Sequence, residues 1–462
     1  MPDYDLYQSP FTWRYASPEM RGIWSEHHKR LLWRRIWVAL AKTQQGFGLV
    51  SAEQLADIEA HVSDIDVPRA LDIEAEIHHD LMAELKTFAE QCPTGGGILH
   101  MGATSMDIED NADALRMREA LDCVLGRLKE LLLAFAEKIE QTADLPVIAF
   151  THIQPAEPST LGYRLASYAQ DLLEDWLRLS TQYAQLRGKG FKGAVGTAAA
   201  YADLIGLDAL EAFEARLSQL LDLPFYPVAT QTYPRKQDYE VISALAGLGG
   251  SVYKLAFDLR LLQSPPIGEL SEPFAKKQVG SSAMPFKRNP INAEKMDSLA
   301  RALAVMPQVA WGNAAHSLLE RTLDDSANRR SMLPEAFLIT DELLRTALRV
   351  VKGLNIREES IQKNLDAYAP FAATERLMMA AVKKGADRQA MHERLREHAL
   401  AAWQAVQQGA ANPLLERIKE DALFQQMLTD AEMESLFDVS AYVGSAPQRA
   451  RELARRIHNL LD

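Results

Sequence analysis

The segment GSSAMPFKRNP, residues 280–290, concentrates hydroxyl, amide and cationic side chains in one helix-hostile stretch. Pro285 opposes helix formation and Gly280 permits unusual dihedral angles, so this segment is predicted to be a loop. Its hydroxyls and backbone N–H groups could hold a carboxylate beside the charge of Lys287. Ser281 or Ser282 could accept a proton only with nearby cations and an oriented partner. A solvated surface loop is the competing interpretation.

Two histidines are further candidates for chemistry. His152, in FTHIQP, stands with the polar residues Thr151 and Gln154 in an otherwise apolar run, which suits proton transfer. A lone histidine more often serves only the fold. His79, in IHHDLM, suits either a ligand contact or an exposed helix turn. There is no HExxH spacing and Cys92 stands apart from the histidines, so we expect no metal centre.

Arginines in ERTLDDSANRR could hold an anion. The candidates to clamp a phosphate or carboxylate are Arg321, Ser326, Arg329 and Arg330. The alternative is a solvated helix end that neighbouring aspartates neutralise. Arg14 and Tyr15 similarly suit either an anion site or an aromatic N-terminal anchor. Glycine-rich phosphate motifs and a GxSxG elbow are absent from the sequence.

Helical periodicity dominates the elements that must position these groups. Between residues 112 and 142, apolar residues recur in steps of three and four, an average of about 3.5 that is typical of helix bundles. These residues are Leu121, Leu125, Leu128, Leu132, Phe135 and Ile139. Similar patterns cover residues 160–186, 238–262, 291–315 and 331–354.

The predicted fold class is all-α, with three helical domains around a long central bundle. Strand-like alternation is scarce, so the chemistry is expected at the breaks between helices. We expect an N-terminal helical domain at residues 1–105, a long-helix domain at 106–355 with a functional loop near 270–290, and a C-terminal helical domain at 356–462.

Composition narrows the class of protein. The chain has 462 residues, of which 47% are hydrophobic, and a formal net charge of −13, which disfavours binding to nucleic acid or membrane surfaces. Two cysteines do not make a disulfide framework and suit a reducing compartment. We find neither a signal peptide nor an apolar run of the ~20 residues that a membrane span needs, and we expect a cytoplasmic protein.

Taken together, the motifs resemble the fumarase/aspartase superfamily, whose signature loop is GSSxMPxKxN. HMGATSMDIEDN and FTHIQP resemble two further regions of that superfamily, in the expected order. WRYASPEM, TQTYPRK and ERTLDDSANRR look like the adenylosuccinate lyase family within it. The resemblance implies elimination of fumarate from adenylosuccinate, giving AMP, and from SAICAR, giving AICAR, in purine biosynthesis. It implies no cofactor.

The resemblance also implies roles for individual residues. Ser281 matches the base, His152 the general acid, and Glu294 the carboxylate that orients that histidine. Lys287 matches a residue that stabilises the carbanion. Substrate binding is implied for Arg14, Tyr15, His79, Asp80, Thr104, Ser105, Thr151, Gln231, Asn289, Arg321, Ser326 and Arg330.

The family assembly is a homotetramer with a twenty-helix core, in which three chains contribute to each site. Two positions depart from the animal-type enzymes, because His78 and Lys295 stand where those have arginine. Both changes weaken anion binding at the edge of the site, since neither side chain has the guanidinium fork. The alternatives are a lyase for another succinyl-amine adduct and an inactive structural paralogue. The inactive protein is disfavoured by the presence of Ser281, Lys287, His152 and Glu294.

Overall fold

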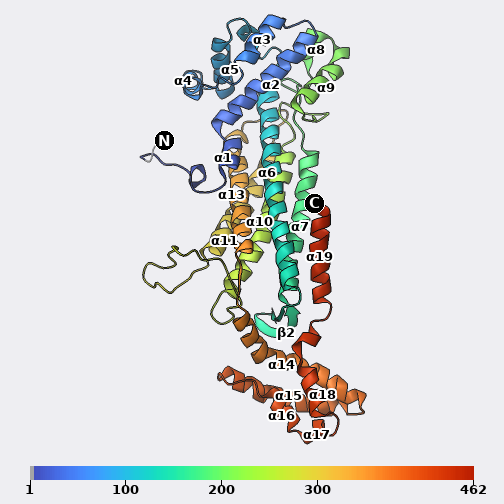
Figure 1. The fold of residues 1–462 in the computed structure, drawn as a ribbon. Coiled ribbons are helices and arrows are strands. Elements are labelled where there is room, and N and C mark those ends of the chain that lie inside the picture. Colours follow the sequence, from blue (N-terminus) through green and yellow to red (C-terminus); the bar gives the residue numbers. More distant parts are fainter. Residues whose placement is uncertain (1–4, 462) are drawn as a thin grey trace. The chain divides into compact units, whose positions relative to one another are not determined.

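The computed structural model describes residues 5–461, which are mainly helical, so the all-α prediction is confirmed (Figure 1). The chain folds into two compact units. Unit 1 comprises the chain up to Leu128, Asp175–Gly250 and Ser298–Arg345. Unit 2 comprises Lys129–Glu174, Ser251–Asp297 and the chain from Thr346.

The N-terminal helices of unit 1 begin at side-chain caps. Ser17, Ser25, Ser51 and Asp66 each accept a hydrogen bond from a backbone N–H in the first helical turn that follows. The elements are η1 (Pro10–Thr12), α1 (Pro18–Ile23), α2 (Glu26–Gly46), α3 (Ala52–Ala60), α4 (Val67–Ile77), α5 (Asp80–Gln91) and η2 (Gly96–Ile98). α8 (Ala199–Ile205), η3 (Leu207–Ala209) and α9 (Leu210–Leu221) also belong to this unit.

A buried ion cluster joins α2 to α5. Arg30 and Arg34 of α2 donate to the two carboxylate oxygens of Glu84 at 3.0 and 2.6 Å. All three side chains are at most 1% exposed, so the Glu84 carboxylate is paired with two guanidinium groups away from water. Removing one partner of such a buried cluster costs about 3–5 kcal/mol. The cluster therefore fixes α5, and with it the residues at the start of that helix.

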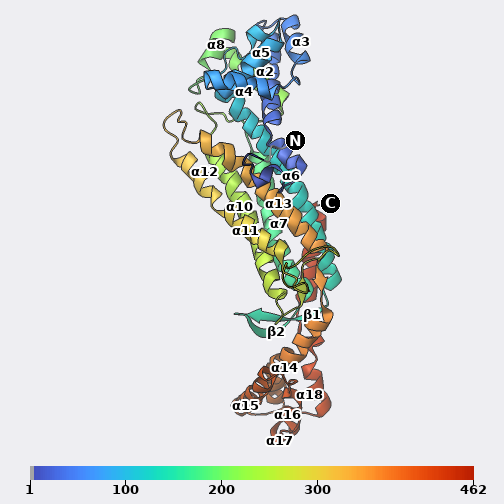
Figure 2. The same ribbon diagram turned by 90° about the vertical axis from the view of Figure 1, so that its left-hand side faces the viewer.

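Long helices supply segments to both units. They are α6 (Ser105–Thr142), α7 (Leu161–Gln185), α10 (Lys236–Leu262), α11 (Ile291–Ala304) and α13 (Ser326–Lys352), whereas the shorter α12 (Met306–Ala315) belongs to unit 1 alone. Within each unit their segments run side by side (Figures 1 and 2). The single helix expected over residues 291–315 is interrupted at Val305. Pro307 explains the break, because proline lacks the N–H and its ring clashes with the carbonyl four residues earlier.

Unit 2 contains a β-hairpin that the periodicity did not predict. β1 (Pro146–Thr151) pairs antiparallel with β2 (Gln154–Thr160), and Thr151 faces Gln154 across a two-residue turn. α14 (Glu358–Lys383) packs against both strands (Figure 2). A short second sheet pairs β3 (Leu270–Ser271) with β4 (Asn355–Ile356).

The C-terminal helices of unit 2 enclose their own apolar core. Its centre includes Leu377, Met391, Phe424 and Met433, which are at most 1% exposed. The remaining elements are α15 (Arg388–Gln407), α16 (Leu414–Lys419), α17 (Ala422–Gln425), α18 (Asp430–Phe437), η4 (Val439–Tyr442) and α19 (Ala446–Leu461). Across the described residues, every helix is too short or too polar to cross a membrane.

Candidate active site

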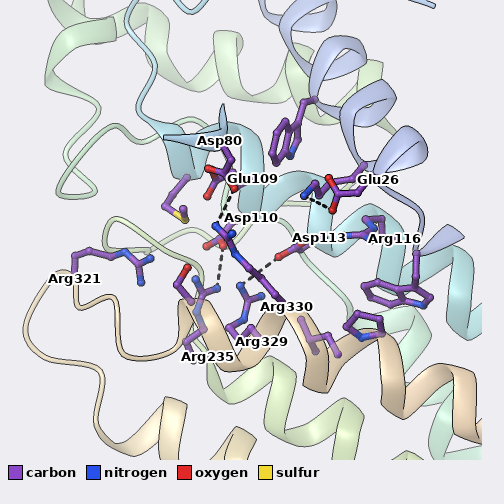
Figure 3. A pocket seen from close by; sticks show the side chains of 17 residues that line it. Glu26, Asp80, Glu109, Asp110, Asp113, Arg116, Arg235, Arg321, Arg329 and Arg330 are labelled. Atoms are coloured by element: carbon purple, nitrogen blue, oxygen red, sulfur yellow. Dashed lines mark hydrogen bonds and ion pairs between the residues drawn. The ribbon is translucent and has the colours of Figure 1, made fainter. Parts of the chain in front are cut away.

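The first turns of α6 line a pocket in unit 1. Met106, Glu109, Asp110, Asp113 and Arg116 face it, and their steps of three, one, three and three place them on one side of the helix. Figure 3 shows this stripe opposite the arginines at the start of α13. The other lining residues are Trp24, Glu26, Lys29, Trp33, Asp80, Arg235, Arg321, Ser326, Arg329, Arg330, Leu333 and Pro334.

Each arginine of the pocket is paired with a carboxylate. Arg330 reaches Asp80 at 2.8 Å, Arg321 reaches Asp325 at 2.8 Å, and Arg116 reaches Asp113 at 3.5 Å. Arg235 contacts Asp110 at 3.0 Å, and Arg329 contacts Asp238 at 2.8 Å. The pocket is therefore rich in charge but nearly balanced, with six cationic and five acidic lining residues.

Burial and neighbouring charge shift the ionisation of several pocket groups. Burial lowers the pKa of Arg329, but the carboxylates of Asp238 and Asp113 outweigh it, so its pKa lies well above the ordinary value. This arginine stays charged at any accessible pH. Burial, followed by the charges of Asp80 and Asp113, raises the pKa of Glu109 to about 8. Glu109 is therefore mainly protonated at neutral pH.

His79 lies between two of the other predicted residues. It caps α5, with Nδ1 accepting from the N–H of Met82 at 3.5 Å, and its Nε2 lies 3.4 Å from the Ser105 hydroxyl. Asp80 follows it and holds Arg330. The cap requires an unprotonated Nδ1, so Nε2 carries the proton in the neutral ring. His78 ends α4 with a positive φ of 56° and is not among the residues that line the pocket.

A buried carboxylate fixes the loop that ends at Thr104, directly before Ser105 begins α6. Asp107 accepts from the N–H of Thr104 at 3.1 Å, from the N–H of Lys192 at 3.1 Å and from the Tyr201 hydroxyl at 3.2 Å. It also forms an ion pair with Lys189, and both side chains are 0% exposed. The loop is thus held by contacts from segments far along the chain.

Six predicted residues of unit 1 lie outside the pocket lining: Arg14, Tyr15, His79, Thr104, Ser105 and Gln231. Arg14 is exposed and its guanidinium stacks on Trp13 and Tyr15, at 5.8 and 5.9 Å from the ring centres. Gln231 donates its backbone N–H to the carbonyl of Glu320 at 3.2 Å. In unit 1, the pocket itself brings together Asp80, Arg321, Ser326 and Arg330.

The signature loop of unit 2 is closed by its own hydrogen bonds. Ser281 Oγ accepts from the N–H of Met284 at 3.1 Å, and the Asn289 amide donates to the carbonyl of Gly280 at 3.0 Å. A Cβ on Gly280 would lie 2.1 Å from the Lys287 carbonyl oxygen, so only glycine fits there. Lys287 itself is exposed. The expected loop is confirmed.

A buried glutamate anchors the helix that follows this loop. Glu272, 3% exposed, accepts from the backbone N–H groups of Asn292 and Ala293 at 3.0 Å each. These donors are otherwise unsatisfied at the start of α11, so the carboxylate caps the helix. Glu294 and Lys295 lie in that first turn, and Glu294 is exposed.

His152 forms the tip of the β-hairpin. His152 and Ile153 are the two turn residues, with φ of 54° and 61°, as a type I′ turn requires. Positive φ is costly for a β-branched residue, so Ile153 stores strain at this tip. In the described part of the chain, no hydrogen bond joins the His152 and Glu294 side chains. Thr151 and His152 are both exposed.

Among residues 5–461, no cluster of three or more His, Cys, Asp and Glu side chains is arranged to hold a metal ion.

Comparison with known proteins assigns the family. Residues 13–304 match the family described as "Lyase", and residues 370–453 match "Adenylosuccinate lyase C-terminus". The adenylosuccinate lyase of Saccharomyces cerevisiae is 39% identical and matches 100% of this chain and 97% of its own length. The chain belongs to the adenylosuccinate lyase family. The relative from Schizosaccharomyces pombe is 38% identical, over 99% of this chain and 95% of its own.

Solved structures share the fold of this chain. The crystal structure of 3-carboxy-cis,cis-muconate lactonizing enzyme from Pseudomonas putida has a TM-score of 0.86 and 24% identity, over 98% of this chain and 100% of its own. A fumarate lyase from Mesorhizobium sp. BNC1 has a TM-score of 0.84 and 24% identity, over 97% of this chain and 99% of its own. The resemblance inferred from the motifs is confirmed for the family.

Sequence reasoning missed most of the charged pocket lining in this adenylosuccinate lyase family member. The helical pattern was followed only from residue 112, whereas α6 begins at Ser105. The polar stripe of Glu109, Asp110 and Asp113 was therefore not recognised. Its spacing was a usable signal, because it continues the same helical period as the apolar residues further along α6.

Proposed function

We propose that this chain catalyses the β-elimination of fumarate from adenylosuccinate, giving AMP, and from SAICAR, giving AICAR. Membership of the adenylosuccinate lyase family over the full chain carries this proposal. A pocket with paired arginines and a loop that carries hydroxyl and ammonium groups suit substrates that carry phosphate and carboxylate groups.

The elimination needs a base, an acid and stabilised negative charge. Ser281 removes the proton next to a succinyl carboxylate, and His152 protonates the leaving nitrogen. The intermediate carries extra charge on that carboxylate, which Lys287 stabilises with donors already in place. Glu294 orients His152, as carboxylates do in other catalytic histidine pairs.

Substrate binding is divided between residues that hold the succinyl carboxylates and residues that hold the nucleotide. Thr104, Ser105, Thr151, Gln231 and Asn289 hold the succinyl carboxylates through hydroxyl and amide donors. The nucleotide phosphate and ribose are held by Arg14, Tyr15, Arg321, Ser326 and Arg330. His79 and Asp80 lie near the base or the phosphate.

The working enzyme is a cytoplasmic homotetramer with a twenty-helix core, in which three chains contribute to each site. Exposed apolar side chains on the long helices support this assembly: Phe257 is 53% exposed and Trp311 is 48% exposed. Apolar groups of this size on helix faces favour burial against another chain. The division into domains 1–105, 106–355 and 356–462 belongs to the same proposal.

Release of fumarate tests the function. The purified chain is incubated with adenylosuccinate and, separately, with SAICAR, while absorbance follows the new double bond and chromatography identifies AMP or AICAR. Turnover of both substrates is expected, and Ser281→Ala serves as the inactive control. Robust elimination from neither substrate would refute the proposal, and equal rates with the control would point to a contaminating lyase.

A further inference from the structure

Glu109 differs from every other acidic residue that lines the pocket. In the described part of the chain, its carboxyl has no hydrogen-bond or ion-pair partner, whereas Asp80, Asp110 and Asp113 are each held by arginine. Glu26 pairs with Lys29 at 2.8 Å. An unpartnered polar group that faces a pocket is available to a ligand.

The position of Glu109 relates it to the proposed substrate site. It lies four residues after Ser105, one turn further along α6, and therefore on the same face of that helix. Figure 3 shows its side chain beside Asp80, where Arg330 also reaches. The Glu109 carboxyl is thus next to a guanidinium that the proposed function assigns to the nucleotide phosphate.

The charged groups around Glu109 are mostly acidic. Asp80 faces it from α5, Asp110 and Asp113 from α6, and Arg330 from α13. Burial and these carboxylates keep it protonated at neutral pH, with a pKa of about 8. A neutral carboxyl can donate its O–H, which an ionised carboxylate cannot.

We propose that Glu109 binds the substrate phosphate as a neutral carboxylic acid, donating its O–H to a phosphate oxygen beside Arg330. This rests on the proposed function, because it requires a nucleotide in this pocket. Phosphate oxygens accept hydrogen bonds, and an ionised carboxylate beside them would repel them. With Glu109 neutral, the lining has six cationic and four anionic side chains, an excess of two positive charges. Ionisation of Glu109 would reduce that excess to one.

Binding is consequently linked to a proton on the enzyme. The second pKa of a phosphate monoester is about 6, so the substrate phosphate does not change charge between pH 7 and 9. In that range Glu109 loses its proton, and the fraction of enzyme in the protonated form that binds phosphate falls. We expect KM to rise by up to about tenfold per pH unit above pH 8, because only the protonated fraction binds, while kcat changes little.

The experiment compares the full-length wild type with Glu109→Gln and a matched control, Glu130→Gln. Glu130 is exposed on the same helix and does not line the pocket. AMP binding is measured by calorimetry from pH 6.5 to 9.5, in buffers of different ionisation enthalpy, alongside steady-state kinetics with adenylosuccinate. Glutamine is the matched replacement because its amide still donates a hydrogen bond but cannot ionise.

Wild type and Glu130→Gln are expected to take up close to one proton per AMP at pH 9 and to show the rise in KM. Glu109→Gln is expected to take up none and to keep a constant KM. A wild-type pH profile in Glu109→Gln would overturn the inference, as would loss of AMP binding by Glu109→Gln at every pH. Failure of wild type to release fumarate would refute the proposed function alone, because AMP binding still reports on Glu109. Failure of wild type to bind AMP at any pH would overturn the inference.

Discussion

Arg330 of α13 donates to Asp80 of α5 across 2.8 Å, although 250 residues separate them in the chain. The arginine is 62% exposed on its side chain, whereas the aspartate is 14% exposed. The pair thus places the Arg330 guanidinium at the edge of the pocket. Its N–H groups that do not contact Asp80 can donate to an anion. A phosphate that binds there competes with Asp80 for the same guanidinium.

Arg330→Lys is expected to raise KM for adenylosuccinate about tenfold or more. Lysine keeps the charge but loses the planar fork that contacts carboxylate and phosphate together. The exposed ion pair contributes little to stability, so the melting temperature should stay within about 2 °C of wild type. Steady-state kinetics and thermal unfolding measure both quantities. An unchanged KM would contradict a role in binding phosphate.

Ser281→Ala and His152→Ala are each expected to lower kcat by at least about 100-fold, as the loss of a general base or acid does. Because His152 is exposed and Ser281 is partly exposed, neither change should alter assembly, which sedimentation can check. If sites are shared between chains, mixing the two inactive variants should restore part of the activity. Near-normal kcat in His152→Ala would refute its role as the acid, and mixtures that stay inactive would refute shared sites.

Asp107→Asn is expected to lower the free energy of unfolding by about 3–5 kcal/mol, because it leaves the Lys189 ammonium buried without its counter-charge. Urea denaturation followed by circular dichroism measures the change. Asp122→Asn is the matched control, since Asp122 is exposed on the same helix. A loss below about 1 kcal/mol would show that Lys189 finds another partner or deprotonates without cost.

Ile153→Gly is expected to be more stable than Ile153→Ala by about 1 kcal/mol. Both variants remove the same exposed side chain, and they differ in their tolerance of the positive φ at this hairpin turn. Chemical denaturation of the two variants in parallel gives the difference. Equal stability would mean that the hairpin tip does not keep its type I′ conformation in solution.

Glu109→Gln is expected to become more stabilising as pH rises. The folded state keeps the Glu109 proton up to a pKa of about 8, whereas the unfolded chain loses it near the ordinary value of 4.5. Between these values the folded state binds the extra proton, so the wild type loses up to about 1.4 kcal/mol of stability per pH unit relative to the glutamine variant. The difference should grow from pH 5 to 8 and then level off. A constant difference would contradict the raised pKa.

The bundle was predictable because its apolar residues repeat along single helices. Leu121, Leu128, Leu132, Phe135 and Ile139 are all fully buried, as their spacing predicts. Leu125 is only partly buried, because the stripe drifts around the helix over several turns. The start of α6 was missed because its first turns carry a polar stripe toward the pocket instead of apolar residues.

The β-hairpin was not predicted, because its residues are unusual for a strand and for a two-residue turn. Its second strand contains Pro155 and Pro158, which are unusual inside strands, and its turn is His-Ile, without asparagine or glycine. The catalytic candidates were found from motifs, which name residues but not their partners. Pairings such as Arg329 with Asp238 depend on the folded chain, since 91 residues separate them.

Both compact units are assembled from three separated stretches of chain, and this has a consequence for protein synthesis. The last stretch of unit 1 ends only at Arg345, and unit 2 needs residues near the C-terminus. Neither unit can therefore finish folding on the ribosome until most of the chain has been translated. Contacts between distant segments form slowly, and the apolar helix faces stay uncovered meanwhile. We therefore expect these faces to stay uncovered for longer in nascent chains of this protein than in chains whose domains are continuous.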